Sequence, residues 1–342
     1  MLMTTGYALL TPGGKLEPWT FPRRDLRDDD VRIRITYCGV CHSDLDAIEH
    51  ATEVLVPGHE FTGEVLAVGP AVTALAVGDP VAVGNIVDSC GVCAACLDEE
   101  ETYCLEFPTL TYGGVDRVDG TPRYGAYSRE MVVRDRFVYP LPDGLDPAGV
   151  APLMCAGVTV WQPLNRLGVG PGTRVGVVGL GGLGHLAVKF AKALGASVAV
   201  FTTSSAKAPL ALELGADEVV VSTSDDDMAS HAHAFDVIID TASAPHDITP
   251  YVLTLDFDGT ICMLGIPPRY DVDSMALLRG RRRLTASGSA GVRDTREMLA
   301  FAGRHGITAD VEVLPAARVQ EALDRLARNE ARWRFVLDLS LR

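Results

Sequence analysis

The sequence of 342 residues lacks any apolar run as long as the ~18 residues that a membrane-spanning helix needs. Its start, MLMTTGYALLTPGGK, lacks the basic residues and apolar centre of a secretory signal. Positive charge is scarce, because 30 lysines and arginines stand against 45 acidic residues and give a net charge of −15. Such a chain repels phosphate backbones, and its one dense basic run, RGRRR at 279–283, is interpreted as a solvated connection. We therefore expect a cytoplasmic protein that binds neither a membrane nor nucleic acid.

Half of the eight cysteines lie in one short stretch, DSCGVCAACLDEEETYC at 88–104. In a reducing cytoplasm, clustered thiols are more often metal ligands than disulfides. Four thiolates at this spacing can surround one Zn²⁺ tetrahedrally and leave no position open for substrate. We therefore predict a structural zinc, with an iron–sulfur cluster or redox thiols as alternatives, and interpret Cys38 and Cys262 as core residues. The predicted ligands are Cys90, Cys93, Cys96 and Cys104.

Three more distant motifs predict a second metal site of a different kind. They are CGVCHSD at 38–44, PGHEFTGEV at 57–65 and APLMCAG at 151–157. Cys41, His59 and Cys155 together form the Cys₂His set of a catalytic zinc whose fourth position is free. Glu60 is a candidate for that position in the resting state. Asp44 is a candidate for accepting the second ring N–H of His59.

From residue 173 the pattern changes to strands that alternate with helices. The expected strands are TRVGVVG, SVAVFTT, EVVV, FDVIIDT, GTICMLGI and LTASGS, and an acidic helix is expected from Asp225. This alternation predicts an α/β fold with a doubly wound parallel sheet of six strands. The G-x-G-x-x-G after the first strand allows a pyrophosphate to approach a helix N-terminus. His185, which follows it, is interpreted as a helix-surface residue rather than a phosphate ligand. The loop comprises Gly179, Leu180, Gly181, Gly182, Leu183 and Gly184.

The end of the second strand is where the ribose of a dinucleotide is expected. It reads FTTSSAK and lacks the carboxylate that would bind the 2′-hydroxyl of NAD. The hydroxyls of Thr202, Thr203 and Ser204, together with Lys207, suit the 2′-phosphate of NADP(H). The other interpretation is an ordinary helix N-cap at Ser204 or Ser205, and the two are compatible.

Together these motifs resemble the zinc-dependent medium-chain alcohol dehydrogenases, within them the cinnamyl alcohol dehydrogenase group with its bacterial broad-range aldehyde reductases. The likeness spans nearly the entire chain: GVCHSDL, PGHEFTGEV, the four-cysteine lobe, YGAYSREMVV, APLMCAGVTVW, GLGGLGHLAVKFAKALGA, FTTSSAK, ELGADEVV and RFVLDL. It implies a GroES-like β-rich catalytic domain at 1–154 plus 292–342, with a structural zinc lobe at 88–105, and a Rossmann domain at 155–291. It also implies NADP(H), two zinc ions per chain, and a homodimer joined through the Rossmann sheet edge by the strand near GTICMLGI.

The resemblance also implies roles for single residues. Cys41, His59 and Cys155 would bind the catalytic zinc, Glu60 would be its exchangeable ligand, and Ser43 would pass the proton to or from the substrate. The residues that would line the cofactor are Thr159, Thr241, Gly265, Gly288, Ser289 and Ala290.

The implied reaction is hydride transfer between the nicotinamide C4 of NADP(H) and the zinc-polarised carbonyl of an aldehyde, as in alcohol dehydrogenases and aldehyde reductases. A family member that reduces a conjugated C=C or iminium bond is one alternative. A catalytically silent NADPH-binding sensor is another.

The sequence departs from the family pattern beside the expected substrate pocket. Asp46 stands where the family has the histidine that ends its proton relay, and the segment between Cys41 and His59 is several residues shorter than usual and lacks the usual aromatics. Asp46, His50 or water would then complete the relay. We favour water, because a deletion beside the pocket should open it, and we expect the same opening to admit bulky or branched aldehydes.

Overall fold

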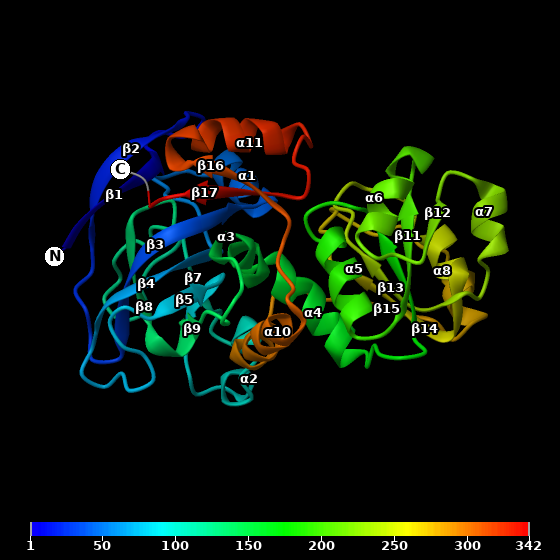
Figure 1. The fold of residues 1–342 in the computed structure, drawn as a ribbon, viewed down its shortest axis with the longest axis horizontal. Coiled ribbons are helices and arrows are strands. Elements are labelled where there is room, and N and C mark those ends of the chain that lie inside the picture. Colours follow the sequence, from blue (N-terminus) through cyan, green and yellow to red (C-terminus); the bar gives the residue numbers. More distant parts are fainter. Residues whose placement is uncertain (1, 341–342) are drawn as a thin grey trace. The chain divides into compact units, whose positions relative to one another are not determined.

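The computed structural model describes residues 2–340, which divide into two compact units (Figure 1). The first unit runs up to Val158 and resumes at Ala290, and the second comprises Thr159–Ser289. The domain limits expected from the sequence, at 154/155 and 291/292, lie within a few residues of these unit boundaries. The division into a catalytic and a cofactor-binding domain at those limits stays a prediction. Among the described helices, none is both long and apolar enough to cross a membrane.

The first unit is built on a seven-stranded sheet in the order β16-β17-β3-β4-β5-β9, with β8 also paired to β3. Strand β17 lies parallel to β16 and antiparallel to β3. The strands of this sheet are β3 (Asp30–Val40), β4 (Phe61–Val68), β5 (Pro80–Val83), β8 (Glu130–Arg134), β9 (Tyr139–Pro140), β16 (Val311–Pro315) and β17 (Arg334–Asp338). Two further pairs are β1 (Leu2–Leu9) with β2 (Leu16–Arg23), and β6 (Ile86–Asp88) with β7 (Thr109–Leu110).

The helices of the first unit are short, except for α10. They are α1 (His42–Glu49), α2 (Ala94–Leu97), η1 (Glu101–Tyr103), η2 (Asp135–Phe137), α3 (Pro147–Val150), η3 (Ala151–Met154), α10 (Val292–His305), η5 (Ala316–Arg318) and α11 (Val319–Ala327). Helix α4 (Ala156–Arg166) carries the chain from the first unit into the second.

Strand β3 shows why the sheet forms and where it leads. Its apolar residues Ile33 and Ile35 are buried while the intervening Arg34 is exposed, the alternation of a strand with one face in the core. Its last residues, Cys38 to Val40, are all buried, because here the strand enters the interior. The chain therefore delivers the next residue, Cys41, to a buried position at the start of α1.

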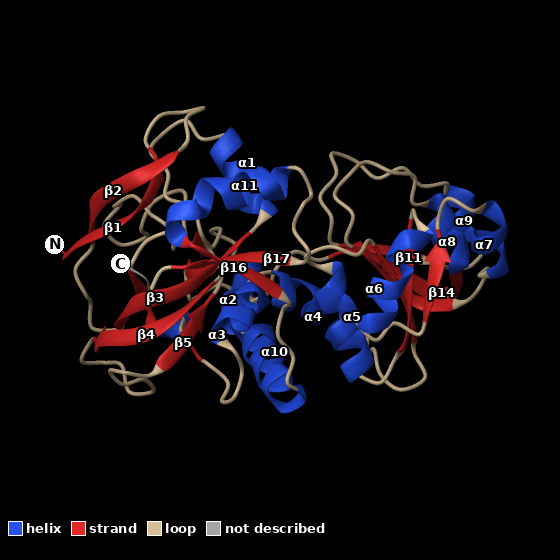
Figure 2. Ribbon diagram, turned by 45° about the horizontal axis from the view of Figure 1, so that its top comes forward, coloured by secondary structure: helices blue, strands red, loops and turns tan. Residues whose placement is uncertain are grey.

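The second unit contains the parallel sheet predicted from the sequence. Six strands lie in the order β12-β11-β10-β13-β14-β15, all paired in parallel, with helices packed alongside (Figure 2). The strands are β10 (Arg174–Val178), β11 (Ser197–Thr202), β12 (Glu218–Val221), β13 (Phe235–Asp240), β14 (Leu255–Met263) and β15 (Arg283–Ala286). The helices are α5 (Gly184–Ala193), η4 (Ser205–Lys207), α6 (Ala208–Glu213), α7 (Asp225–Ser230), α8 (Thr249–Thr254) and α9 (Ser274–Leu278).

Two expectations about this unit are corrected by the structure. Strand β14, which contains GTICM, has a neighbour on each side, so the free edges of the sheet are β12 and β15 and a dimer could not pair through β14. His185 is fully buried in α5, with Nδ1 3.1 Å from the carbonyl oxygen of Gly181, and is not a helix-surface residue. The core positions expected for Cys38 and Cys262 are confirmed, since both are buried.

The acidic segment DEEE after the third clustered cysteine is bound to the first turn of α10. The buried carboxylate of Glu101 accepts hydrogen bonds from the Val292 N–H at 2.8 Å and from Arg136 Nη2 at 2.6 Å. Arg293 reaches Glu100 at 2.7 Å. The four-cysteine lobe is therefore tied to a helix that begins far along the sequence.

We expect Glu101→Gln to destabilise the protein because it removes the negative charge from a buried acceptor. Hydrogen bonds to charged groups contribute about 1.5–3 kcal/mol, and urea denaturation should show a loss of that order in the free energy of unfolding. Glu106→Gln is the control: its carboxylate is exposed and pairs with Arg117 at 3.1 Å, and surface pairs contribute about 0–1 kcal/mol. Equal losses in both variants would contradict the role of Glu101.

Candidate active site

The structure brings Cys41, His59 and Cys155 together within the first unit. Their possible ligand atoms all lie within 4.8 Å of one another. His59 Nε2 is 3.2 Å from Cys155 Sγ. The three come from the end of β3, the turn before β4, and the end of η3, so the fold of the whole unit assembles them. A thiolate, an imidazole and a thiolate make a set that fits zinc and leaves a fourth position.

The local sequence places Asp44 behind His59. Cys41 is the N-cap of α1, and Asp44, three residues later, accepts the Cys41 N–H at 2.9 Å in a capping box. The other oxygen of the carboxylate lies 3.1 Å from His59 Nδ1. Burial alone would lower the pKa of His59, but the charge of Asp44 raises it well above its usual value. With Nδ1 engaged by Asp44, the ring turns Nε2 towards the sulfur ligands.

The two thiols at this site are coupled to each other by a hydrogen bond. Hydrogen bonding with Cys155, and then with His59, lowers the pKa of Cys41 well below its ordinary value. Hydrogen bonding with Cys41 and burial raise the pKa of Cys155. The protein alone thus favours one thiolate within this pair. Since zinc binds thiolates rather than thiols, the residues fit the predicted metal.

Glu60 lies beside this ligand set with its carboxylate completely buried. Oε1 accepts a hydrogen bond from Nη2 of Arg334 on β17, while Oε2 has no hydrogen-bond partner within the described chain. Burial raises the pKa of Glu60 to about 7 despite the opposing charge of Arg334. Gly39 makes room for the group, because a Cβ there would lie 2.2 Å from Oε1. A carboxylate held at one oxygen and free at the other suits an exchangeable ligand.

The four clustered cysteines form the second candidate site. Their sulfur atoms lie within 4.8 Å of one another. The Cys90 and Cys96 sulfurs are 3.8 Å apart, which is the edge expected for a tetrahedron with Zn–S bonds of about 2.3 Å. The backbone N–H groups of Cys93 and Leu105 point at the sulfurs of Cys90 and Cys93, at 3.4 and 3.5 Å, and would stabilise thiolates. This closed set fits a structural zinc.

Of the three residues considered for proton transfer, Ser43 and Asp46 lie on α1 and His50 is its C-cap. Ser43 is exposed near the ligands, with its hydroxyl 3.7 Å from Cys41 Sγ. The side chains of Asp46 and His50 are 79% and 72% exposed. These two residues contact each other, since His50 Nδ1 lies 2.9 Å from the Asp46 carbonyl oxygen. The structure therefore brings Ser43, but not the other two, to the metal ligands.

The glycine-rich loop has the close contacts that require glycine. Gly179 has a φ of +86°. A Cβ at Gly184 would lie 2.1 Å from the Gly179 carbonyl oxygen. Thr241 donates to the Val178 carbonyl at 2.8 Å, and a Cβ at Gly265 would lie 2.0 Å from the Ala242 carbonyl oxygen. These residues gather at the carboxyl ends of β10, β13 and β14, where doubly wound sheets bind ligands.

The other predicted cofactor residues lie in three places. Leu180, Gly181, Gly182 and Leu183 form the turn that leads into α5. Gly288 and Ser289 follow β15 within the second unit, whereas Ala290 begins the return to the first. Thr159 lies in α4.

The stretch FTTSSAK forms a helix cap. Ser204 is the N-cap of η4, and its hydroxyl accepts the Ala206 N–H at 3.2 Å, which confirms the capping interpretation. Thr202 is buried, while Thr203 and Lys207 are exposed. The exposed lysine is available to a 2′-phosphate, and that role stays a prediction.

Three residues near the ligands were missed by the sequence reasoning. Arg334 holds Glu60. The Tyr127 hydroxyl donates to Asp44 at 2.9 Å. The Tyr112 hydroxyl donates to the Ser43 carbonyl at 3.1 Å, and its ring centroid is 5.7 Å from that of His59. The motifs YGAYS and RFVLDL contain the first two, but spacing along the chain does not reveal which strands lie beside the ligands.

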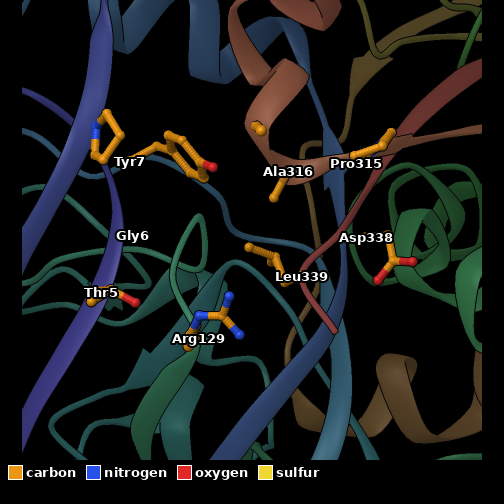
Figure 3. Close-up of a pocket in the computed structure, with 10 residues that line it drawn as sticks. Thr5, Gly6, Tyr7, Arg129, Pro315, Ala316, Asp338 and Leu339 are labelled. Atoms are coloured by element: carbon orange, nitrogen blue, oxygen red, sulfur yellow. The ribbon is translucent and has the colours of Figure 1, made fainter. Parts of the chain in front are cut away.

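The first unit also contains a cavity of about 190 Å³, whose lining is drawn in Figure 3. Its lining includes Tyr7, Arg129 and Asp338 but none of the predicted site residues. The Asp338 carboxylate accepts the Ser340 N–H at 2.9 Å. The cavity is therefore not part of the candidate active site.

Comparison with known proteins agrees with this geometry. Residues 27–143 match the alcohol dehydrogenase GroES-like domain, and residues 182–304 match the zinc-binding dehydrogenase family. An aldehyde reductase of Escherichia coli (strain K12) is 44% identical over 330 residues, covering 94% of this chain and 94% of the relative.

Two solved structures are similar to the chain along its length. A cinnamyl alcohol dehydrogenase from Sorghum bicolor has a TM-score of 0.95 and 42% identity, covering 99% of this chain and 98% of that one. The CAD from Helicobacter pylori, complexed with NADP(H), has a TM-score of 0.92 and 31% identity, covering 99% of both chains.

The chain therefore belongs to the zinc-dependent medium-chain alcohol dehydrogenases, in the cinnamyl alcohol dehydrogenase group. It is an oxidoreductase of the alcohol dehydrogenase and aldehyde reductase type. The expected fold class, a GroES-like unit with an inserted Rossmann sheet, is confirmed.

Mutations at the two metal sites should have different effects. We expect Cys93→Ser to lose one zinc and to lower the melting temperature, because a structural zinc contributes directly to folding. Cys155→Ser should stay folded and bind NADPH, while its turnover falls by more than the 10–100-fold typical of altered outer-shell partners.

Metal analysis and aldehyde reduction check both outcomes. Cys262→Ser is the control, because Cys262 is a buried thiol outside both ligand sets and its loss should leave the zinc content unchanged. A single zinc in the unmodified chain, or an undiminished rate in Cys155→Ser, would refute the assignment.

Proposed function

We propose that the chain is an NADP(H)-dependent aldehyde reductase that also works in reverse as an alcohol dehydrogenase. The observation that carries the proposal is the Cys41–His59–Cys155 set, with Asp44 bonded to the far side of His59 and Glu60 beside the ligands. The similarity to an aldehyde reductase and to a CAD complexed with NADP(H) supports the substrate class and the cofactor.

The chain's own residues hold the centre and move the proton. When bound, zinc supplies a Lewis acid for the carbonyl oxygen, and NADPH supplies the hydride. Cys41 and Cys155 would hold the ion as thiolates, and His59 would bind it through Nε2 after releasing the proton from that nitrogen, while Asp44 keeps the proton on Nδ1. Glu60, whose Oε2 has no hydrogen-bond partner within the described chain, would be the exchangeable ligand at the fourth position. The hydroxyl of Ser43, exposed beside Cys41, would give its proton to the substrate oxygen and regain one from water.

We further propose two zinc ions per chain, one at each ligand set, and a homodimer joined through the edge of the Rossmann sheet. The four residues of β15 are all exposed and lie at a free edge of the sheet, which supports pairing there. Reduced thiols at both metal sites support a cytoplasmic location. The partner in the reaction is a small aldehyde or alcohol.

The test is oxidation of NADPH, followed at its absorbance, over aldehydes and conjugated enals. Reduction of the aldehyde group that disappears when zinc is removed supports the proposal. Reduction of the C=C bond without zinc supports the alternative reductase, and binding of NADPH without any turnover supports a sensor. An intact ligand set with an open position argues against the sensor.

Lys207→Ala should weaken the binding of NADPH far more than the binding of NADH. Losing a charge-assisted contact with the 2′-phosphate costs about 1.5–3 kcal/mol, or roughly ten- to more than a hundredfold in Kd. Fluorescence titration with both cofactors measures the difference. Lys192→Ala is the control, since this lysine pairs with Asp217 at 2.8 Å. Equal losses of NADPH and NADH would show that Lys207 does not read the phosphate.

Asp46→Asn and His50→Ala should each change kcat for aldehyde reduction by less than about tenfold, below the ~10²–10⁴ typical of general acid–base groups. Both side chains are largely exposed, so water rather than either residue would complete the relay. Ser43→Ala is the matched comparison on the same helix and should lose at least about a hundredfold. A loss of that size at Asp46 or His50 would identify the relay instead.

A further inference from the structure

The main chain around Tyr127 holds the turn that carries His59. The Tyr127 N–H donates to the Pro57 carbonyl at 2.9 Å, and the Ala126 N–H donates to the Gly58 carbonyl at 2.9 Å. Gly58 has a φ of +97°, and a Cβ there would lie 2.6 Å from Tyr127 Cδ1. The tyrosine ring therefore packs directly on the turn, and the backbone of Ala126 and Tyr127 holds the two residues that precede His59.

The side chain of the same residue reaches the carboxylate behind His59. The Tyr127 hydroxyl donates to Asp44 Oδ2 at 2.9 Å, and both residues are 0% exposed. Burial, and then the charge of Asp44, raises the pKa of Tyr127 well above its usual value, so the hydroxyl keeps its proton and remains a donor. Tyr127 thus contacts the turn with its backbone and the carboxylate with its hydroxyl.

Asp44 accepts four hydrogen bonds, and they differ in origin. Oδ2 also accepts the Cys41 N–H at 2.9 Å, and Oδ1 accepts from the Gly58 N–H and faces His59 Nδ1, both at 3.1 Å. These three donors belong to the segments that carry the zinc ligands and move with them. The Tyr127 hydroxyl comes from outside those segments. It therefore holds the carboxylate from a segment that carries no zinc ligand.

We propose that Tyr127 is a positioning residue of the Cys41–His59–Cys155 zinc site, which acts through Asp44 to fix the orientation of His59 and to slow loss of the ion. The inference rests on the proposed function, because it requires zinc at this ligand set. Mutation of a residue that bonds to a metal ligand typically changes metal affinity by 10–100-fold. Tyr127 is one hydrogen bond farther from the ion, so we expect its loss to speed zinc release by roughly three- to tenfold.

Tyr127→Phe tests the inference, because it removes the hydroxyl and keeps the ring and backbone. Zinc release from the loaded enzyme to a chromogenic chelator is followed over time, and the phase missing in Cys155→Ser belongs to the Cys41–His59–Cys155 site. We expect this phase to be faster by roughly three- to tenfold and the phase of the four-cysteine site to be unchanged. Tyr139→Phe is the matched control: this buried tyrosine bonds to Thr295, and its loss should alter neither phase.

Asp44→Asn provides a second, independent measurement. If Tyr127 acts through Asp44, Asp44→Asn accelerates release and the added Tyr127→Phe change gives little further acceleration. The inference is overturned if the accelerations of zinc release by the two substitutions multiply in the double variant. It is also overturned if the Tyr127→Phe release rate lies within about twofold of that of the unmodified enzyme. A Tyr127→Phe protein that unfolds while Tyr139→Phe does not overturns it as well, because the hydroxyl would then serve the fold. Absence of zinc from this site in the unmodified enzyme would instead refute the proposed function.

Discussion

The candidate active site depends on satisfying one buried carboxylate. Asp44 is fully enclosed, and a charge removed from water must regain its hydrogen bonds from the protein. Its donors come from the start of α1, from the turn before β4, from the imidazole of His59 and from the tyrosine segment before β8. Each of these segments has to be in place before the charge is stabilised. The same requirement therefore brings the metal ligands together.

The carboxylate of Glu60 is also buried, but it is held by far fewer hydrogen bonds than that of Asp44. It is as deeply buried as Asp44, but among the described residues its carboxylate bonds to Arg334 through one oxygen, and the other oxygen has no partner. Four hydrogen bonds hold a carboxylate still, whereas a single ion pair allows it to turn. Burial accordingly raises the pKa of Glu60 to about 7. Of the two carboxylates close to this metal site, Asp44 is therefore suited to orienting the ligand His59, and Glu60 is suited to being an exchangeable ligand.

The parts of the molecule that could be predicted from the sequence are those with local patterns. The six strands of the parallel sheet, the glycine-rich loop and the four-cysteine lobe each occupy one continuous stretch, and rare residue types mark the scattered ligands. Contacts made by distant strands were not predictable. Arg334 reaches Glu60 only because β17 pairs with β3, and β14 lies inside the sheet rather than at its edge. Nothing in the composition of α5 showed that His185 faces inward.

The first unit is completed by β17, which follows the second unit in the sequence, and this order has a consequence for biosynthesis. Strand β17 lies between β16 and β3, and it delivers Arg334 to Glu60 across 274 positions of sequence. As the chain leaves the ribosome, the second unit has all of its own strands before that one appears. Until then β3 has an open edge and Glu60 has no counter-charge. Folding of the inserted unit is thus free to precede closure of the unit that surrounds it in sequence, and the pocket around Glu60 closes only after β17 has been made.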